Sequence, residues 1–287
     1  MTGRPIPSEA DVLRAGYNHP AFVRRRSILR ETLDAFTSAE PPDKYQQLAA
    51  TNLRRWRNER KRNDSIGQVR VIAGDWGEVT HALTKFHGTC FAVLNMANAY
   101  VPGGAYVEGA PAQEENMFRR TDCHFHVGDD EYDRLRDCYL PEMTRLISGE
   151  TGVVFLDSKN PRICIRGPED RSQPSLGYEW LPDDEVFPFF EIRAAAQDLR
   201  DGSAFDPDEA RRRIAAQFDT LLQHRIRHAV LGASGCGAFM NPARDVARIY
   251  KEEIHVRRAD FAIIAFAIFH SGYGPDNHRP FAEMFRD

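Results

Sequence analysis

The chain has 287 residues, 42% of them hydrophobic and 28% charged, which is typical of a folded globular protein. Its net charge of −4 argues against a protein that binds nucleic acid directly over a broad basic surface. The five cysteines form no CxxC pair, so the sequence predicts neither a disulfide framework nor a zinc ribbon. Reduced thiols and an N-terminus without a signal-like apolar core predict a cytoplasmic protein. The most apolar stretch, residues 261–269, is too short for a membrane span.

The first part of the chain, residues 1–66, is polar and helical in pattern. Ile28, Leu29, Leu33 and Phe36 recur at helical spacing, and residues 44–61 continue in the same style. We expect this segment to form a helical extension that packs on a core domain over residues 67–287.

From residue 67 onward, predicted strands and helices alternate. Helices are predicted after Asp75 and Asp206, each a candidate N-cap, after Asn241, and over residues 132–147 with an interruption near Pro141. The alternation predicts a three-layer α/β domain. The predicted strands are residues 68–74, 90–95, 153–157, 163–167, 186–195, 228–232 and 261–269.

One loop combines glycines with acidic residues. It follows the predicted strand at 90–95, where α/β folds bind ligands, and Gly103 and Gly104 allow the backbone to approach a ligand closely. Gln113, Glu114 and Glu115 then place an amide and two carboxylates side by side, and two carboxylates can divide acid and base roles. The structural alternative is a glycine turn followed by acidic residues that favour a helix N-terminus.

A second loop, residues 232–239, has the sequence GASGCGAF. Small residues expose backbone N–H groups that can hold an anion such as a pyrophosphate. The structural alternative is a close crossing of strand and helix. Carboxylates on one loop and an anion cradle on the other together favour a nucleotide diphosphate-sugar as the ligand.

These two segments resemble one family. The glycines of Pro102-Gly-Gly-Ala, followed by Gln113-Glu-Glu, resemble the signature of poly(ADP-ribose) glycohydrolases. The lead-in LNMANAYVPGG matches the bacterial-type members, and GASGCGAFMNP resembles their diphosphate-binding loop. The resemblance implies an α/β fold, namely a three-layer α/β/α macrodomain with a mixed central sheet and an N-terminal helical extension. It implies hydrolysis of the glycosidic bond of ADP-ribose in poly(ADP-ribose) or in ADP-ribosylated protein, by a monomer that needs no cofactor.

The resemblance also assigns roles to residues. Glu115 corresponds to the catalytic acid/base, Glu114 to the residue that binds ribose hydroxyls beside the scissile bond, and Asn98 to a residue that holds the distal ribose. Phe239 matches an aromatic residue that orders that ribose. The third glycine of the signature is Ala105 here, which puts the fit of the loop in question. The other expected ligand-binding residues are Gly103, Gly104, Gln113, Ser234, Gly235, Cys236, Gly237 and Ala238.

Two alternatives remain open from the sequence. Asp122 is a further acid near the signature, and some similar macrodomains use aspartates to remove mono-ADP-ribose from arginine. A reader that binds ADP-ribose without cleaving it is the other alternative, although an intact Gln-Glu-Glu favours catalysis. Cys123, His124 and His126 lie close together, but no second pair of ligands follows at a suitable spacing, so no metal site is predicted.

Overall fold

The computed structural model describes residues 3–60, 66–270 and 274–286. This part of the chain forms a seven-stranded sheet in the order β1-β9-β8-β2-β7-β5, and β6 pairs with β7 beyond that path. Neighbouring strands from β1 to β7 are parallel, whereas β5 and β6 run antiparallel to β7. The sheet is therefore mixed, as expected. The strands are β1 (Gln68–Ala73), β2 (Ala92–Met96), β5 (Phe155–Leu156), β6 (Arg162–Cys164), β7 (Phe187–Ala194), β8 (His228–Leu231) and β9 (Ile263–Ile268).

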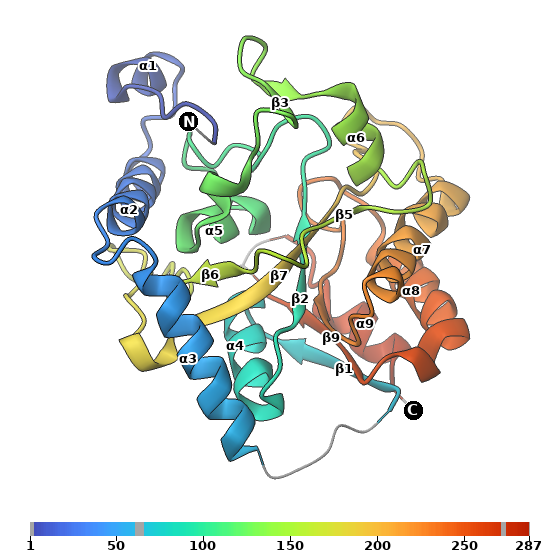
Figure 1. The fold of residues 1–287 in the computed structure, drawn as a ribbon. Coiled ribbons are helices and arrows are strands. Elements are labelled where there is room, and N and C mark those ends of the chain that lie inside the picture. Colours follow the sequence, from blue (N-terminus) through green and yellow to red (C-terminus); the bar gives the residue numbers. More distant parts are fainter. Residues whose placement is uncertain (1–2, 61–65, 271–273, 287) are drawn as a thin grey trace.

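Helices cover both faces of the sheet (Figure 1). On β9, alternate residues enter two different cores: Ile264 and Phe266 pack with α7 and α8, while Ile263 and Ala265 pack on the opposite side. Because both faces of β9 are buried, its sequence is a continuous apolar run. The three-layer α/β/α prediction is confirmed. The helices are α1 (Glu9–Arg14), α2 (Pro20–Thr37), α3 (Lys44–Glu59), α4 (Trp76–His87), α5 (Gln113–Arg120), α6 (Pro141–Ile147), α7 (Pro207–Gln223), α8 (Ala243–Arg257) and α9 (His278–Met284).

The two predicted aspartate caps are confirmed. Asp75 accepts hydrogen bonds from the backbone N–H groups of Gly77 and Glu78 at the start of α4. Asp206 does the same for Asp208 and Glu209 at the start of α7, where a proline occupies the first turn. None of the helices described is long and apolar enough to cross a membrane.

The N-terminal helices pack on the rest of the chain as α2 against α5 and α3 against both α4 and β7. The Thr32 hydroxyl of α2 donates a 2.7 Å hydrogen bond to the carbonyl of Arg119, the penultimate residue of α5. The helix that carries the acidic signature is thus supported by a segment far from it in sequence. The division at residue 66 stays a prediction, and residues 61–65 lie outside the described part.

The helix predicted over residues 132–147 is wrong in its first half. Residues 132–139 form a hairpin of β3 (Tyr132–Asp133) and β4 (Cys138–Tyr139), and only α6 after it is helical. Asp133 accepts the N–H groups of Leu135 and Arg136, which closes a turn, and Asp137 has a positive φ of 52°. The turn chemistry of these aspartates outweighs the apolar spacing that suggested a helix.

Candidate active site

A cleft of about 680 Å³ lies where the parallel strands end. Loops that follow the carboxyl ends of β1, β2, β7, β8 and β9 all contribute to its wall, which is the usual ligand position in an open α/β sheet. We call residues 97–112, between β2 and α5, the glycine loop, and residues 232–242, between β8 and α8, the second loop. Both loops line this one cleft, so the structure brings the two sequence motifs together.

Gln113 fixes the start of α5 to the end of β2. Its side-chain oxygen accepts the N–H of Met96 at 3.0 Å, and its amide nitrogen donates to the carbonyl of Leu94 at 2.9 Å. The amide therefore continues the backbone pairing of β2. This anchor places Glu114 and Glu115, which we call the acid pair, in the first turn of α5 at the wall of the cleft.

The acid pair is buried, with Glu114 3% and Glu115 8% exposed. Glu114 accepts backbone N–H groups on both oxygens, from Asn98 at 2.7 Å and from Gly103 at 3.1 Å. Glu115 accepts one, because its Oε1 bonds to the N–H of Ala105 at 3.0 Å. The other oxygen, Oε2, is buried and has no hydrogen-bond partner within the described residues. At the wall of a cleft, such an atom is free to bond to a ligand.

The glycines make room for these carboxylates. Gly104 has a φ of +57°, and a Cβ there would lie 2.5 Å from Glu115 Oε1 and 3.1 Å from Glu114 Oε2. Gly103 has a φ of +73°, and its Cβ would collide with the Tyr106 ring at 2.5 Å. Ala105 does not have a positive φ, so a methyl group at this position needs no strained backbone. The replacement of the third signature glycine is therefore compatible with the loop.

Burial controls the electrostatics of the acid pair. Desolvation raises the pKa of Glu114 well above its usual value, and the nearby charge of Glu115 raises it further. Desolvation also raises the pKa of Glu115, although the Ala105 N–H and the Arg119 charge act in the opposite direction. Two coupled buried carboxyls hold a proton more readily than isolated ones. The surroundings of the two carboxyls differ, because Glu114 accepts an N–H group on each oxygen whereas Oε2 of Glu115 has no partner among the described residues.

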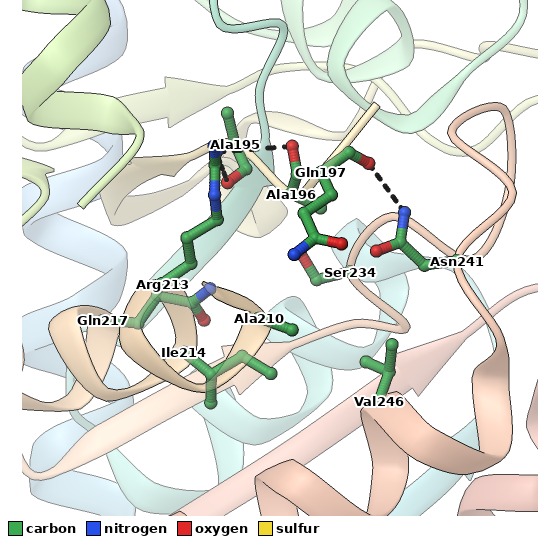
Figure 2. A pocket seen from close by; sticks show the side chains of 10 residues that line it. All are labelled: Ala195, Ala196, Gln197, Ala210, Arg213, Ile214, Gln217, Ser234, Asn241 and Val246. Carbon is green, nitrogen blue, oxygen red and sulfur yellow. Dashed lines mark hydrogen bonds between the residues drawn. The ribbon is translucent and has the colours of Figure 1, made fainter. Parts of the chain in front are cut away.

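The side-chain amide of Asn241 connects the second loop to the loop after β7, and Figure 2 shows its hydrogen bond to Gln197. The Asn241 amide nitrogen donates to the carbonyls of Gln197, Gly235 and Phe239, at 2.7, 3.2 and 3.2 Å. The Arg213 guanidinium donates to the carbonyl of Ala195 at 3.0 Å in the same region. Asn241, Gln197 and Arg213 are among the residues that line a cavity of only about 10 Å³, close to the smallest space that holds one water.

Three residues of the second loop that line the cleft have free backbone N–H groups. The N–H groups of Gly235, Gly237 and Ala238 have no acceptor in the described part of the chain, and all three residues line the cleft. Several N–H groups that lack internal acceptors and face one cavity form an anion-binding nest. Cys236 is buried, and burial raises the pKa of its thiol to about 12, so it is a packed residue and not a nucleophile.

Most predicted site residues line the cleft. They are Asn98, Ala105, Gln113, Glu114, Glu115, Gly235, Cys236, Gly237, Ala238 and Phe239. Gly103 and Gly104 lie behind the acid pair and shape the loop instead of lining the cleft. Ser234 lines the small cavity beneath the second loop.

Asp122 is not brought to the cleft. Its Oδ1 accepts the N–H of Ile163 in β6 at 2.7 Å, and its Oδ2 lies 3.3 Å from His126 Nε2. The carboxylate thus connects the end of α5 to the sheet, and it is absent from the cleft wall. The Cys123–His126 cluster belongs to no group of potential metal ligands in the described residues.

Three features of the site lie outside the sequence motifs. Arg200, from the loop after β7, lines the cleft with its guanidinium carbon 5.0 Å from the centre of the Phe239 ring. Glu169 and Arg171 form part of the wall and are joined by an ion pair of 2.9 Å. Arg4 contacts the glycine loop from behind. No local pattern marks these residues, because each reaches the site only through the folded chain.

Comparisons with known proteins agree with this geometry. Residues 30–138 match the family model of the microbial-type PARG catalytic domain, a range that includes the glycine loop and the acid pair. No curated protein is similar enough in sequence to count as a relative.

The fold is shared with solved bacterial structures. The poly(ADP-ribose) glycohydrolase of Thermomonospora curvata is 22% identical with a TM-score of 0.61, over 91% of this chain and 99% of that one. Its complex with the inhibitor ADP-HPD gives a TM-score of 0.60 at the same identity and coverage. The Deinococcus radiodurans enzyme in complex with ADP-ribose is 22% identical with a TM-score of 0.53, over 85% and 91% of the two chains. The chain thus matches the microbial-type PARG catalytic-domain model over residues 30–138, and it shares its fold with bacterial poly(ADP-ribose) glycohydrolases over most of its length.

Proposed function

We propose that the protein hydrolyses the glycosidic bond between ribose units of poly(ADP-ribose), with Glu115 as the general acid and base. The observation that carries the proposal is the buried, unpartnered Oε2 of Glu115 at the wall of a cleft whose other side presents free backbone N–H groups. Such a cleft fits a diphosphate on the second loop and an anomeric carbon beside the acid pair.

Glu115 is suited to carry a proton to the leaving group. Its Oε1 is fixed by the Ala105 N–H, so the proton resides on Oε2. Donation of this proton to the ribose oxygen breaks the bond to C1, which develops oxocarbenium character. The ionised Glu115 then removes a proton from the attacking water, and the original protonation state returns. Raised pKa values in the buried pair keep the acid protonated before the reaction.

Glu114 and the second loop supply binding. Each oxygen of Glu114 accepts one N–H and keeps a lone pair that a ribose hydroxyl can use. The free N–H groups of Gly235, Gly237 and Ala238 bind the diphosphate, far from the bond that breaks. Binding energy gained there positions the sugar at Glu115. We also propose a monomer, since residues of one chain form both loops of the cleft, and a cytoplasmic location, since its five cysteines are free.

The test is the Glu115→Gln variant, which keeps the shape of the side chain but can neither donate nor accept the catalytic proton. We expect release of ADP-ribose from labelled polymer to fall by about 10²–10⁴-fold, the usual contribution of a general acid/base. Calorimetric affinity for ADP-ribose should stay within about threefold, because the second loop is unchanged. The exposed Glu150 provides the control Glu150→Gln, which should behave as wild type.

Two further substrates separate the alternatives. If the wild-type protein releases ADP-ribose from arginine-modified protein but not from polymer, the mono-ADP-ribosyl function replaces the proposed one. If it binds ADP-ribose and releases nothing from either substrate, the protein is a reader. Unchanged polymer turnover in Glu115→Gln would refute the role of Glu115.

A further inference from the structure

An arginine near the N-terminus reaches the glycine loop from the side opposite to the acid pair. The side chain of Arg4 is buried, and its Nη1 donates a 2.6 Å hydrogen bond to the carbonyl of Gly104. Arg4 and Gly104 are 100 residues apart in sequence, so the contact exists only in the folded chain. An arginine that donates to a buried carbonyl makes a charge-assisted bond, which is stronger than a neutral one.

The carbonyl that Arg4 binds belongs to the same peptide unit as the N–H that holds Glu115. The Gly104–Ala105 peptide accepts from Arg4 through its oxygen and donates to Glu115 Oε1 through its nitrogen, at 3.0 Å. The oxygen and the N–H of a peptide unit point in opposite directions. One planar group therefore connects the guanidinium to the carboxyl.

This peptide needs an external constraint on its orientation. Gly103 and Gly104 both have positive φ values, +73° and +57°, and glycine has the widest choice of backbone conformations. Rotation of the peptide unit would turn its oxygen toward Glu115 and remove the hydrogen bond that fixes Oε1. A cation at the carbonyl opposes this rotation, because the rotated state leaves Nη1 of the buried guanidinium without its acceptor.

Arg4 is itself fixed on three sides. Its Nε and Nη2 donate to the two oxygens of Asp137 at 2.8 and 2.6 Å, and Nη2 also contacts Glu108 at 3.3 Å. Asp137 lies at the end of the turn between β3 and β4, and the Tyr132 hydroxyl donates to it. The preceding Gly3 donates its N–H to Val127 at 3.1 Å. The guanidinium is thus preorganised and bridges the hairpin and the glycine loop.

We propose that Arg4 is a positioning residue for the reaction: it holds the Gly104–Ala105 peptide with its N–H toward Glu115, so that Oε1 is fixed and Oε2 carries the proton. The inference rests on the proposed function for its effect on turnover. The orientation of the peptide itself can be measured without any activity.

Several charged side chains in the described part of the chain act on Glu115. Glu114 and Arg119 lie on α5, Glu108 lies in the glycine loop, and Arg200 comes from the loop after β7. The Ala105 N–H lowers the pKa of Glu115. When this hydrogen bond is lost, the ionised form is less stable, so the pKa of Glu115 rises. The Arg4→Lys variant keeps the positive charge and therefore separates orientation from charge.

The experiment compares Arg4→Ala and Arg4→Lys with the control Arg211→Ala, which removes a partly exposed arginine paired with Glu252 and Glu253, away from the cleft. Selective ¹⁵N-alanine labelling makes the Ala105 amide visible by NMR, and its chemical shift is followed against pH. We expect the wild-type amide to titrate with Glu115. In Arg4→Ala the Ala105 amide resonance should lose its downfield position. The change of its chemical shift that follows the titration of Glu115 should move to higher pH. The Ala105 chemical shift of Arg4→Lys should lie between those of wild type and Arg4→Ala, because one ammonium group cannot bind Asp137 and the Gly104 carbonyl together as the guanidinium does.

Turnover gives the second readout. We expect kcat on polymer to fall by about 10- to 100-fold in Arg4→Ala, the effect of one charge-assisted hydrogen bond, with ADP-ribose affinity within about threefold. Millimolar methylguanidine should restore part of the rate, which it would not do for a general loss of folding. Arg211→Ala should match wild type in both readouts.

Failures of the two proposals are distinguishable. If the wild-type protein is inactive on polymer, the proposed function is refuted. If the Ala105 amide resonance nevertheless moves in Arg4→Ala, the role of Arg4 in orienting the peptide is retained. A wild-type amide resonance and wild-type kcat in Arg4→Ala overturn the inference. If Arg4→Ala fails to fold, the chemical shift of the Ala105 amide is measured in Arg4→Lys instead. An unchanged shift overturns the inference, and a displaced shift supports it.

Discussion

The two loops that face each other across the cleft are held by different chemistry. The glycine loop is fixed by ionisable side chains, with Arg4 on its outer side and the acid pair on its inner side. The second loop is fixed by a neutral amide, Asn241, that donates to three carbonyls. The loop assigned to proton transfer thus depends on charge and pH, and the loop assigned to diphosphate binding does not.

This difference matches what each loop has to do. A carboxyl that gives and takes a proton needs a tuned pKa, and burial beside another carboxyl supplies that tuning. An anion cradle needs rigid N–H groups whose direction is the same at every pH, and a side-chain amide supports them without titrating. Substitutions in the two loops should therefore separate catalysis from binding.

Among the substitutions that compare the two loops, the largest effect is expected from Gly104→Ala. The new methyl group would meet Glu115 Oε1 at 2.5 Å, and the positive φ costs an alanine roughly 1–2 kcal/mol. We expect kcat to fall by about 10³-fold and the free energy of unfolding by at least about 1–2 kcal/mol. The matched variant is Gly237→Ala in the second loop, where the described residues, apart from the two chain neighbours, place no atom within 4 Å of the added Cβ. Equal losses of stability in the two variants would contradict the account.

Asn241→Ala should weaken the second loop, and with it the binding of ADP-ribose. Loss of hydrogen bonds to three carbonyls loosens the second loop and costs about 1–3 kcal/mol. We expect weaker binding of ADP-ribose, by about 10-fold or more, with a smaller change in kcat at saturating polymer. Calorimetry and initial rates measure the two quantities. The pKa seen in the pH–rate profile should stay at its wild-type value. A displaced profile would mean that the second loop also affects proton transfer.

The pH dependence should originate in the acid pair. Because the folded protein raises the pKa of these carboxyls above 4.5, it binds a proton more tightly than the unfolded chain. The free energy of unfolding should therefore decrease as pH rises from about 4.5 through the raised pKa, by about 1.4 kcal/mol for each pH unit that separates the folded from the unfolded pKa. Turnover should also fall in that range as the acid loses its proton. Urea unfolding of Glu115→Gln should show a flatter dependence than wild type, whereas an unchanged slope would place the proton elsewhere.

The smallest effect on turnover is expected from Asp122→Asn. Its carboxylate bonds to Ile163 and His126 away from the cleft, so kcat on polymer should change by less than about threefold. Stability should fall by about 1 kcal/mol from the weakened bond to the Ile163 N–H. A large loss of activity toward arginine-modified protein, with folding intact, would restore the alternative that uses Asp122.

The motifs near each strand end were predictable because their information is local. Gln113, Glu114 and Glu115 follow a buried strand and open a helix, and the glycines precede them at short range. The caps Asp75 and Asp206 were predictable for the same reason. A strand end and a helix start are set by a few neighbouring residues, so the sequence alone indicates where these side chains emerge.

The missed features depend on distant contacts. Residues 132–139 have apolar spacing that suits a helix, yet they form a hairpin in which the Tyr139 N–H donates to the carbonyl of Tyr100 in the glycine loop. Asp137 in that hairpin holds Arg4, which in turn holds Gly104. Each of these contacts joins two residues that are far apart in sequence. The sequence therefore predicted the acids but not the groups that orient them.

The most direct test of the account is a crystal structure of the Glu115→Gln variant with ADP-ribose. We predict that the diphosphate oxygens accept hydrogen bonds from the N–H groups of residues 235–238, and that C1 of the distal ribose lies beside the side chain at position 115. A ligand that occupies the cleft without touching both loops would contradict the claim that they act on one substrate.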